Sequence, residues 1–250
     1  MVGWVQAGGW GLVAGSALLV GAAVGYLAPV PRKIVASVMA FGAGVLLSAV
    51  AFDLIAEARE RAGLLPTAVG AAIGAVTYTG CNLFLARRGA RHRKRSGTQQ
   101  PSEAEQGGSG LALALGALLD GVPESVVIGA SLLGGGAVSA VTVIAVFISN
   151  VPEGLSSAAG MRNAGRSTTY VFGLWGGITL ISGLAALAGY TLLAGASAAL
   201  LAGITALAGG AILTMIADTM IPEAFENAHL LIGLITVAGF LAAFSLSQLG

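Results

Sequence analysis

The chain has 250 residues, of which 56% are hydrophobic and 9% are charged, and its mean hydropathy is +0.89. A typical soluble domain carries about 25% charged residues, so this composition excludes an ordinary soluble fold. The net charge of +1 does not support nucleic-acid binding, and the single Cys81 excludes a disulfide framework or a cysteine-rich metal site. The composition predicts an all-α polytopic membrane protein whose first partner is the lipid bilayer.

Eight stretches of the sequence are apolar and long enough to cross a bilayer, which takes about 20 residues. A short turn around Gly195 separates the sixth stretch from the seventh. The sequence therefore predicts a single transmembrane domain over residues 1–250. The predicted spans are 10–28, 34–57, 65–86, 111–133, 138–160, 169–193, 197–222 and 229–249.

The basic residues predict the orientation, because cytoplasmic connections carry an excess of Lys and Arg. Ten of the 12 basic residues fall in the first, third and fifth connections, which lie on one side. We therefore expect a multi-pass protein of the cell membrane with both termini extracytoplasmic. The third connection, residues 87–110, begins with a basic cluster and continues with polar residues. This composition predicts a disordered cytoplasmic loop whose basic cluster lies beside anionic lipid.

Three acidic residues, Asp120, Glu124 and Glu153, fall near the middle of the fourth and fifth spans. An acidic residue at the helix centre costs about 2.5–3.5 kcal/mol on insertion scales, and neither span contains Lys or Arg. We therefore expect these carboxylates to be protonated, to share protons, or to bind a cation that comes from outside. The last option describes a transport site, and hydrogen bonding by protonated acids is the structural alternative.

The fourth and fifth spans share a motif, Val-Pro-Glu followed by a small residue, which contains Glu124 and Glu153. A proline inside a helix frees the carbonyl four residues earlier. A freed carbonyl beside a carboxylate is a good oxygen ligand for a cation. The i,i+4 spacing also places Asp120 on the same helix face as Glu124, and Ser149 on the same face as Glu153. The paired motifs therefore predict one cation site between two adjacent helices.

The second and seventh spans resemble each other when the sequence is shifted by 166 residues. The shift aligns Gly44 with Gly210 and Glu57 with Glu223. Because the two spans run in opposite directions in the predicted topology, the repeat is inverted, as in many secondary transporters. It relates helices 1–3 to helices 6–8 around a central pair, helices 4 and 5. Chance similarity between helices rich in alanine and glycine is the alternative.

In these features the chain resembles the ZIP (Zrt-, Irt-like) family of divalent metal transporters. The resemblance covers both Pro-Glu motifs, the span number, the position of the long loop, and the Ile-Pro-Glu-Ala segment from Ile221 to Ala224. It implies a ZIP-like fold of eight helices and zinc uptake into the cytoplasm through a mid-membrane site on helices 4 and 5. The chain is similar to a divergent member, because Asp120 replaces a usual site histidine and the only histidines are His92 and His229.

Carried over to this chain, the resemblance implies the metal ligands Asp120, Glu124, Asn150 and Glu153, with Ser149 as a weaker candidate. Zinc accepts carboxylate oxygens but favours histidine and cysteine at tight sites. Sites made only of oxygen suit manganese, magnesium or calcium more. Zinc is therefore the expected substrate, with a selectivity shifted to manganese as an alternative. The transported ion is a substrate, and no cofactor is expected.

Four further acidic residues are candidates for the ion pathway: Asp53 and Glu57 toward the entrance, Asp218, and Glu223 toward the exit. We do not expect an enzyme, because the sequence has no HExxH motif and no suitable Ser/His pair at membrane depth. A membrane homologue that binds or senses metal without transporting it is one alternative, and a proton-coupled carrier for another solute is a second. A homodimer is compatible with the sequence.

Overall fold

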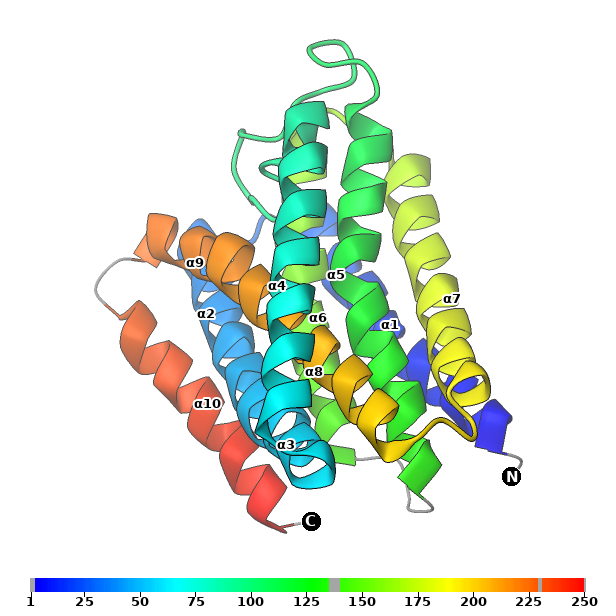
Figure 1. The fold of residues 1–250 in the computed structure, drawn as a ribbon. Coiled ribbons are helices and arrows are strands. Elements are labelled where there is room, and N and C mark those ends of the chain that lie inside the picture. Colours follow the sequence, from blue (N-terminus) through cyan, green and yellow to red (C-terminus); the bar gives the residue numbers. More distant parts are fainter. Residues whose placement is uncertain (1–2, 135–139, 229–230, 250) are drawn as a thin grey trace.

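The computed structural model describes residues 3–134, 140–228 and 231–249. Its described secondary structure is entirely helical and forms a bundle (Figure 1). Within the described residues, seven helices are long and apolar enough to cross a membrane, which confirms a multi-pass membrane protein. An eighth helix, α10 (Ile232–Leu249), is also apolar but has only 18 residues. It rises about 27 Å, slightly less than a hydrocarbon core of about 30 Å.

Within the described residues, each predicted span corresponds to one continuous helical run. Ser197 caps the seventh run by accepting a hydrogen bond from Leu200 N, which confirms the predicted division after the sixth span. Three of the runs before α10 are single helices: α1 (Gly3–Leu27), α6 (Ala140–Asn163) and α7 (Thr168–Leu192). Two runs are a helix followed by a short segment: α4 (Leu64–Leu85) with the π-helical Ala86–Ala90, and α5 (Ser109–Ser131) with the 3-10 turn Leu132–Gly134. Two runs are a pair of helices joined by a π-helical segment: α2 (Arg32–Ser48), Ala49–Ile55 and α3 (Ala56–Ala62), and α8 (Ala198–Met215), Ile216–Met220 and α9 (Ile221–Ala228).

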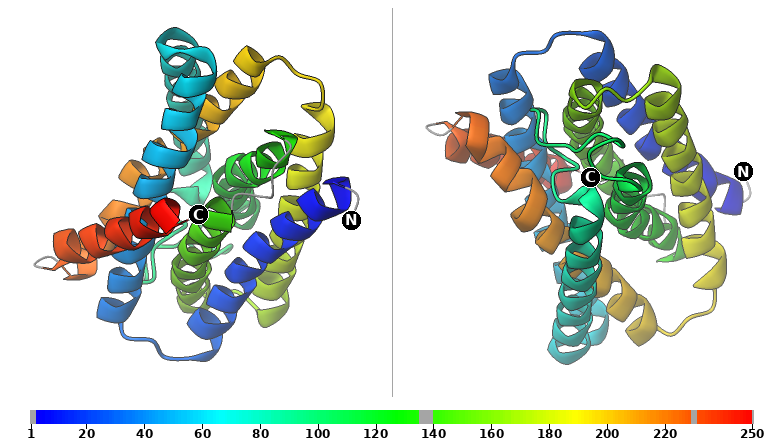
Figure 2. Two further views of the ribbon diagram at one scale, coloured as in Figure 1. Left: turned by 90° about the horizontal axis from the view of Figure 1, so that it is seen from below. Right: turned by 90° about the horizontal axis from the view of Figure 1, so that it is seen from above.

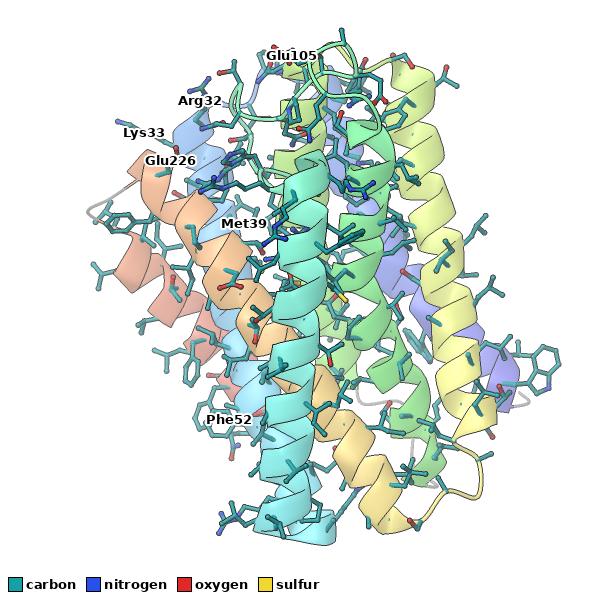
Figure 3. The ribbon with its side chains drawn as sticks, turned by 45° about the horizontal axis from the view of Figure 1, so that its top comes forward. Arg32, Lys33, Met39, Phe52, Glu105 and Glu226 are labelled. Atoms are coloured by element: carbon teal, nitrogen blue, oxygen red, sulfur yellow. The ribbon has the colours of Figure 1, made fainter. Side chains whose placement is uncertain are left out.

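The connections that carry most of the basic residues lie at one end of the bundle. Both chain termini lie at the opposite end (Figure 1). Arg32 and Lys33, at the start of α2, lie toward the same end as Glu105 of the α4–α5 connection (Figure 3). The fold therefore agrees with the predicted alternation of the connections from side to side.

The eight helical runs of the described residues pack as two groups of four that meet at the centre of the bundle (Figure 2). In the first group, α1 packs against α6 and α7, and α5 packs against α7. In the second group, α2 packs against α10 and α4 packs against α8. Contacts of α2 with α6 and of α5 with α8 join the two groups. The two Pro-Glu helices, α5 and α6, therefore lie at the boundary between the groups.

Glycines allow paired helices to touch backbone against backbone. A Cβ atom on Gly44 would overlap the carbonyl oxygen of Thr236 in α10, and a Cβ atom on Gly210 would overlap that of Ala71 in α4. Small residues let membrane helices approach this closely, so the high glycine content has a packing role. The same contact joins α6 to α1 at Gly154 and Leu18, and α5 to α7 at Gly129 and Ala186.

We expect Gly44→Ala and Gly210→Ala to lower the thermal unfolding temperature in detergent, because each added methyl forces two helix backbones apart. Overpacking of this kind costs about 1–3 kcal/mol. The matched control is Gly173→Ala, a helical position where a Cβ atom meets nothing within 4 Å. The control should keep or slightly raise the unfolding temperature, since alanine favours helix over glycine by about 1 kcal/mol. Equal unfolding temperatures for the three variants would contradict this account.

Candidate functional site

Three carboxylates are buried at the centre of the bundle. Asp120 and Glu124 lie on α5 and Glu153 lies on α6, and they are 2%, 2% and 4% exposed. Both helices continue through their internal prolines, Pro123 and Pro152. Buried carboxylates are costly unless they are neutral or paired with a positive group. Their partners therefore decide what this region of the protein does.

The partners are two basic residues of the α4–α5 connection. Lys94 Nζ lies 2.8 Å from Glu153 Oε2 and 3.4 Å from Asp120 Oδ2. Arg93 donates to both oxygens of Asp120, from Nε and from Nη2, each at 2.9 Å. Both basic side chains are only 3% exposed. The alternatives drawn from the sequence were protonation, shared protons or a cation from outside. They did not include Arg93 and Lys94, because only basic residues within the spans were considered.

The guanidinium of Arg93 also binds α4. It donates from Nη1 to Asn82 Oδ1 and from Nη2 to the Tyr78 hydroxyl, both at 2.7 Å. Tyr78 in turn donates to Asp120 Oδ1 at 2.6 Å. The sequence analysis missed Tyr78 and Asn82 as members of the site. Their i,i+4 spacing, which puts two polar side chains on one helix face, is the signal that could have found them.

Glu223, predicted as a pathway residue, lies beside this site. It accepts hydrogen bonds at Oε1 from the backbone and the hydroxyl of Ser96, at 3.0 and 2.8 Å, and from Ser156 Oγ at 3.2 Å. Arg95 Nη1 lies 3.4 Å from Glu223 Oε2 and also pairs with Glu226. The connection therefore contacts α9 as well as the central helices.

Residues 91–100, which we call the inserted segment, lie against the backbone of α6. Gln100 Nε2 donates to the carbonyls of Arg93 and Arg95 at 3.1 and 3.0 Å. The same nitrogen lies 3.1 Å from the carbonyl oxygen of Ser157 on α6. Contact with α6 is close, because a Cβ atom on Gly160 would overlap the carbonyl oxygen of Arg95 and the amide of Gln100.

The outer part of the same connection is held at its base by an ion pair. Arg166 Nη1 lies 2.7 Å from Glu103 Oε2, which also accepts the backbone N–H of Gly110 at 3.0 Å. Hydrogen bonds from Arg166 and from the backbone N–H groups of Gly108 and Gly110 lower the pKa of Glu103 to about 2. Glu103 therefore stays ionised at neutral pH. The disorder expected for residues 87–110 stays a prediction, and Figure 2 shows their path across the end of the bundle.

The remaining predicted ligands direct their donor groups to the backbone. Asn150 Nδ2 donates to the carbonyl of Ala14 on α1 at 3.0 Å, and Ser149 Oγ donates to that of Val146 at 2.9 Å. Glu124 Oε1 is buried without a hydrogen-bond partner among the described residues. Across residues 3–134, 140–228 and 231–249, no three His, Cys, Asp or Glu side chains form a group that could hold a metal. The ligand role of Asp120, Glu124, Ser149, Asn150 and Glu153 stays a prediction.

Two of the predicted pathway residues lie in π-helical segments, which occur frequently at functional sites. Asp53 lies in the segment before α3, half-buried, and its Oδ2 has no hydrogen-bond partner in the described part of the chain. Asp218 lies in the segment before α9 and is exposed. Glu57 pairs with Arg61 on α3. His229 lies outside the described residues.

Comparison with known proteins finds no family model and no curated protein that matches this chain. The geometry of the buried charges is therefore what indicates a function.

We expect Arg93→Gln to destabilise the folded protein, because it removes the bidentate partner of a buried carboxylate. Breaking a buried ion pair from one side costs about 3–5 kcal/mol. The matched control is Arg91→Gln, which removes an exposed charge from the same segment and should change stability by less than about 0.5 kcal/mol. Unfolding in detergent measures both. Adding Asp120→Asn to Arg93→Gln should recover part of the loss, and a strictly additive loss would contradict the pairing.

Proposed function

We propose that this protein is a membrane carrier for divalent metal cations and that zinc is its substrate. The observation that carries the proposal is the convergence of Asp120 and Glu153, from two different central helices, on one positive group. That group is Lys94 Nζ, 3.4 and 2.8 Å from the two carboxylates. Ionisable residues at membrane depth are typical of ion pathways. Carboxylates that hold an ammonium group at this depth also offer the oxygen ligands and the charge that a metal cation needs.

The symmetry of the bundle supports a carrier with a ZIP-like inverted repeat. Under the shift of 166 residues, the π-helical Ala49–Ile55 corresponds to the π-helical Ile216–Met220. The glycine contacts correspond as well, since Gly44 joins the second run to the eighth and Gly210 joins the seventh to the third. We therefore relate helices 1–3 to helices 6–8 around α5 and α6. Secondary carriers bind their substrates at the interface between such repeats.

The proposed route follows the acidic residues through the bundle. The proposed entrance is Asp53 and Glu57, which lie on the run from α2 to α3, and α3 is at the end of the bundle that contains the termini (Figure 1). The ion then meets Asp120, Glu124 and Glu153, and it leaves past Glu223, which hydrogen-bonds Ser156 on α6. With the basic connections on the cytoplasmic side, this route describes uptake. Because the proposed ligands are oxygen atoms, manganese is the competing substrate.

The test is influx of zinc, manganese and cadmium into sealed vesicles that contain the purified protein. Zinc influx should fall to the level of protein-free vesicles in Glu124→Gln and in Glu153→Gln, because each variant removes one of the proposed carboxylate ligands. Glu105→Gln is the matched control, since Glu105 is exposed in the α4–α5 connection, and it should transport at the native rate. Manganese influx without zinc influx would make manganese the substrate in place of zinc. No influx of any of the three ions would contradict a carrier.

A second function is favoured by the same ion pairs. Arg93 and Lys94 supply two positive charges to Asp120 and Glu153, so these two carboxylates are paired by the protein itself. This arrangement also suits a membrane protein that binds or senses metal without moving it. Zinc binding by the purified protein without influx into vesicles would select this second function.

A further inference from the structure

We propose that residues 93–96 are a tethered cationic gate that occupies the place of the transported ion. In this structure Lys94 and Arg93 hold the carboxylates of the cation site, and a divalent cation binds only after they withdraw. This inference rests on the proposed function, because it assigns the means by which the same site is closed.

The charges of the gate match those of the ion that it would replace. Arg93 and Lys94 carry two positive charges and face Asp120 and Glu153, so exchanging them for one divalent ion leaves the total charge of the buried cluster unchanged. Binding both together would add two positive charges to the cluster in a region of low dielectric, where they repel strongly. Lys94 also occupies Glu153 Oε2 and Asp120 Oδ2, which the ion would need. The gate and the ion therefore exclude each other.

The contacts of the gate join the two helix groups. Arg93 links Tyr78 and Asn82 on α4 to Asp120 on α5. Ser96 binds Glu223 on α9, which also accepts a hydrogen bond from α6. Alternating access requires one part of a carrier to move against the other. The gate in place thus closes the cation site and also ties together the groups that must move, and its withdrawal removes both restraints.

The inserted segment is built to leave without unfolding the bundle. Hydrogen bonds from Gln100, Asn163 and Ser156 hold its backbone, and water can replace each of them. Residues 96–108 contain no large apolar side chain, so withdrawal exposes little apolar surface. The main cost of withdrawal is therefore the loss of the two ion pairs to Asp120 and Glu153, and a divalent ion bound to the same carboxylates would replace them. The ion pair between Glu103 and Arg166 lies beyond the gate and keeps the outer part of the connection anchored.

Gly160 provides a way to displace the gate without changing any charge. A Cβ atom at this position would overlap the carbonyl oxygen of Arg95 and the amide of Gln100. Gly160→Ala therefore pushes the inserted segment away from α6 while Asp120 and Glu153 remain as they are. Lys94→Gln reaches the same result by removing a charge. Two independent changes should thus have the same effect on metal binding.

The first measurement is the zinc concentration for half-maximal influx into vesicles. Lys94→Gln and Gly160→Ala should each lower it by about tenfold. If the native site is open for only about one-tenth of the time, its apparent affinity is about tenfold lower than that of a site that is always open. Arg91→Gln and Gly173→Ala are the matched controls for charge and for the added methyl, and both should match the native protein. Zinc influx with one half-saturation value for all four variants would overturn the gate.

The second measurement is amide hydrogen exchange of residues 92–100 in the native protein with and without zinc chloride. Saturating zinc should raise exchange in this segment, since the ion and the gate cannot occupy the site together. Unchanged exchange in a protein that transports zinc would overturn the gate while the carrier stands. Absence of both zinc binding and influx would instead overturn the carrier, and the gate with it. If Gly160→Ala or Lys94→Gln does not fold, the exchange data on the native protein decide.

Discussion

The pairing of buried carboxylates with basic side chains is the interaction on which this structure depends. The surroundings of Asp120 and Glu153 contain few polar groups, because the bundle has few charges. An unpaired ion at that depth is strongly unfavourable. The α4–α5 connection meets the need by entering the bundle with Arg93 and Lys94. Those two side chains are positioned by the backbone of the connection, which contacts α6 and α9 and approaches α6 closely at Gly160.

Glycine makes this arrangement possible. Backbone contacts at Gly44, Gly210, Gly154 and Gly129 hold the helices within each group close together. The boundary between the groups contains the carboxylates, the inserted segment and the hydrogen bond from Ser156 to Glu223, beside an apolar cluster that includes Val45 and Ala49 on the run from α2 to α3 and Ala145 on α6. The polar contacts at this boundary can be exchanged for others when one group moves against the other, as the proposed carrier would require.

Features that depend on residues close together in the sequence were predicted correctly, and contacts between residues far apart in the sequence were not. The helical runs and the Pro-Glu pair were predictable, because hydropathy and i,i+4 spacing are local properties. The counterions were not predictable in the same way, because Lys94 reaches Glu153 across 59 residues and Arg93 reaches Asp120 across 27. A polar connection looks the same in sequence whether it lies in water or folds back between helices. Tyr78 and Asn82 were missed for the same reason, because their bonds to Arg93 also depend on the path of the connection.

The sequence by itself determined that this is a helical membrane protein, how many apolar runs it has, and that acidic residues lie near the middle of two of them. These properties come from composition and spacing, which do not depend on how the runs pack. Only the tertiary structure decided which charges meet. The carboxylates of α5 and α6 need positive partners, and those partners could come from solvent, from another helix or from a connection. The choice of Arg93 and Lys94 depends on the path of the chain between α4 and α5, and spacing along the sequence does not contain that path.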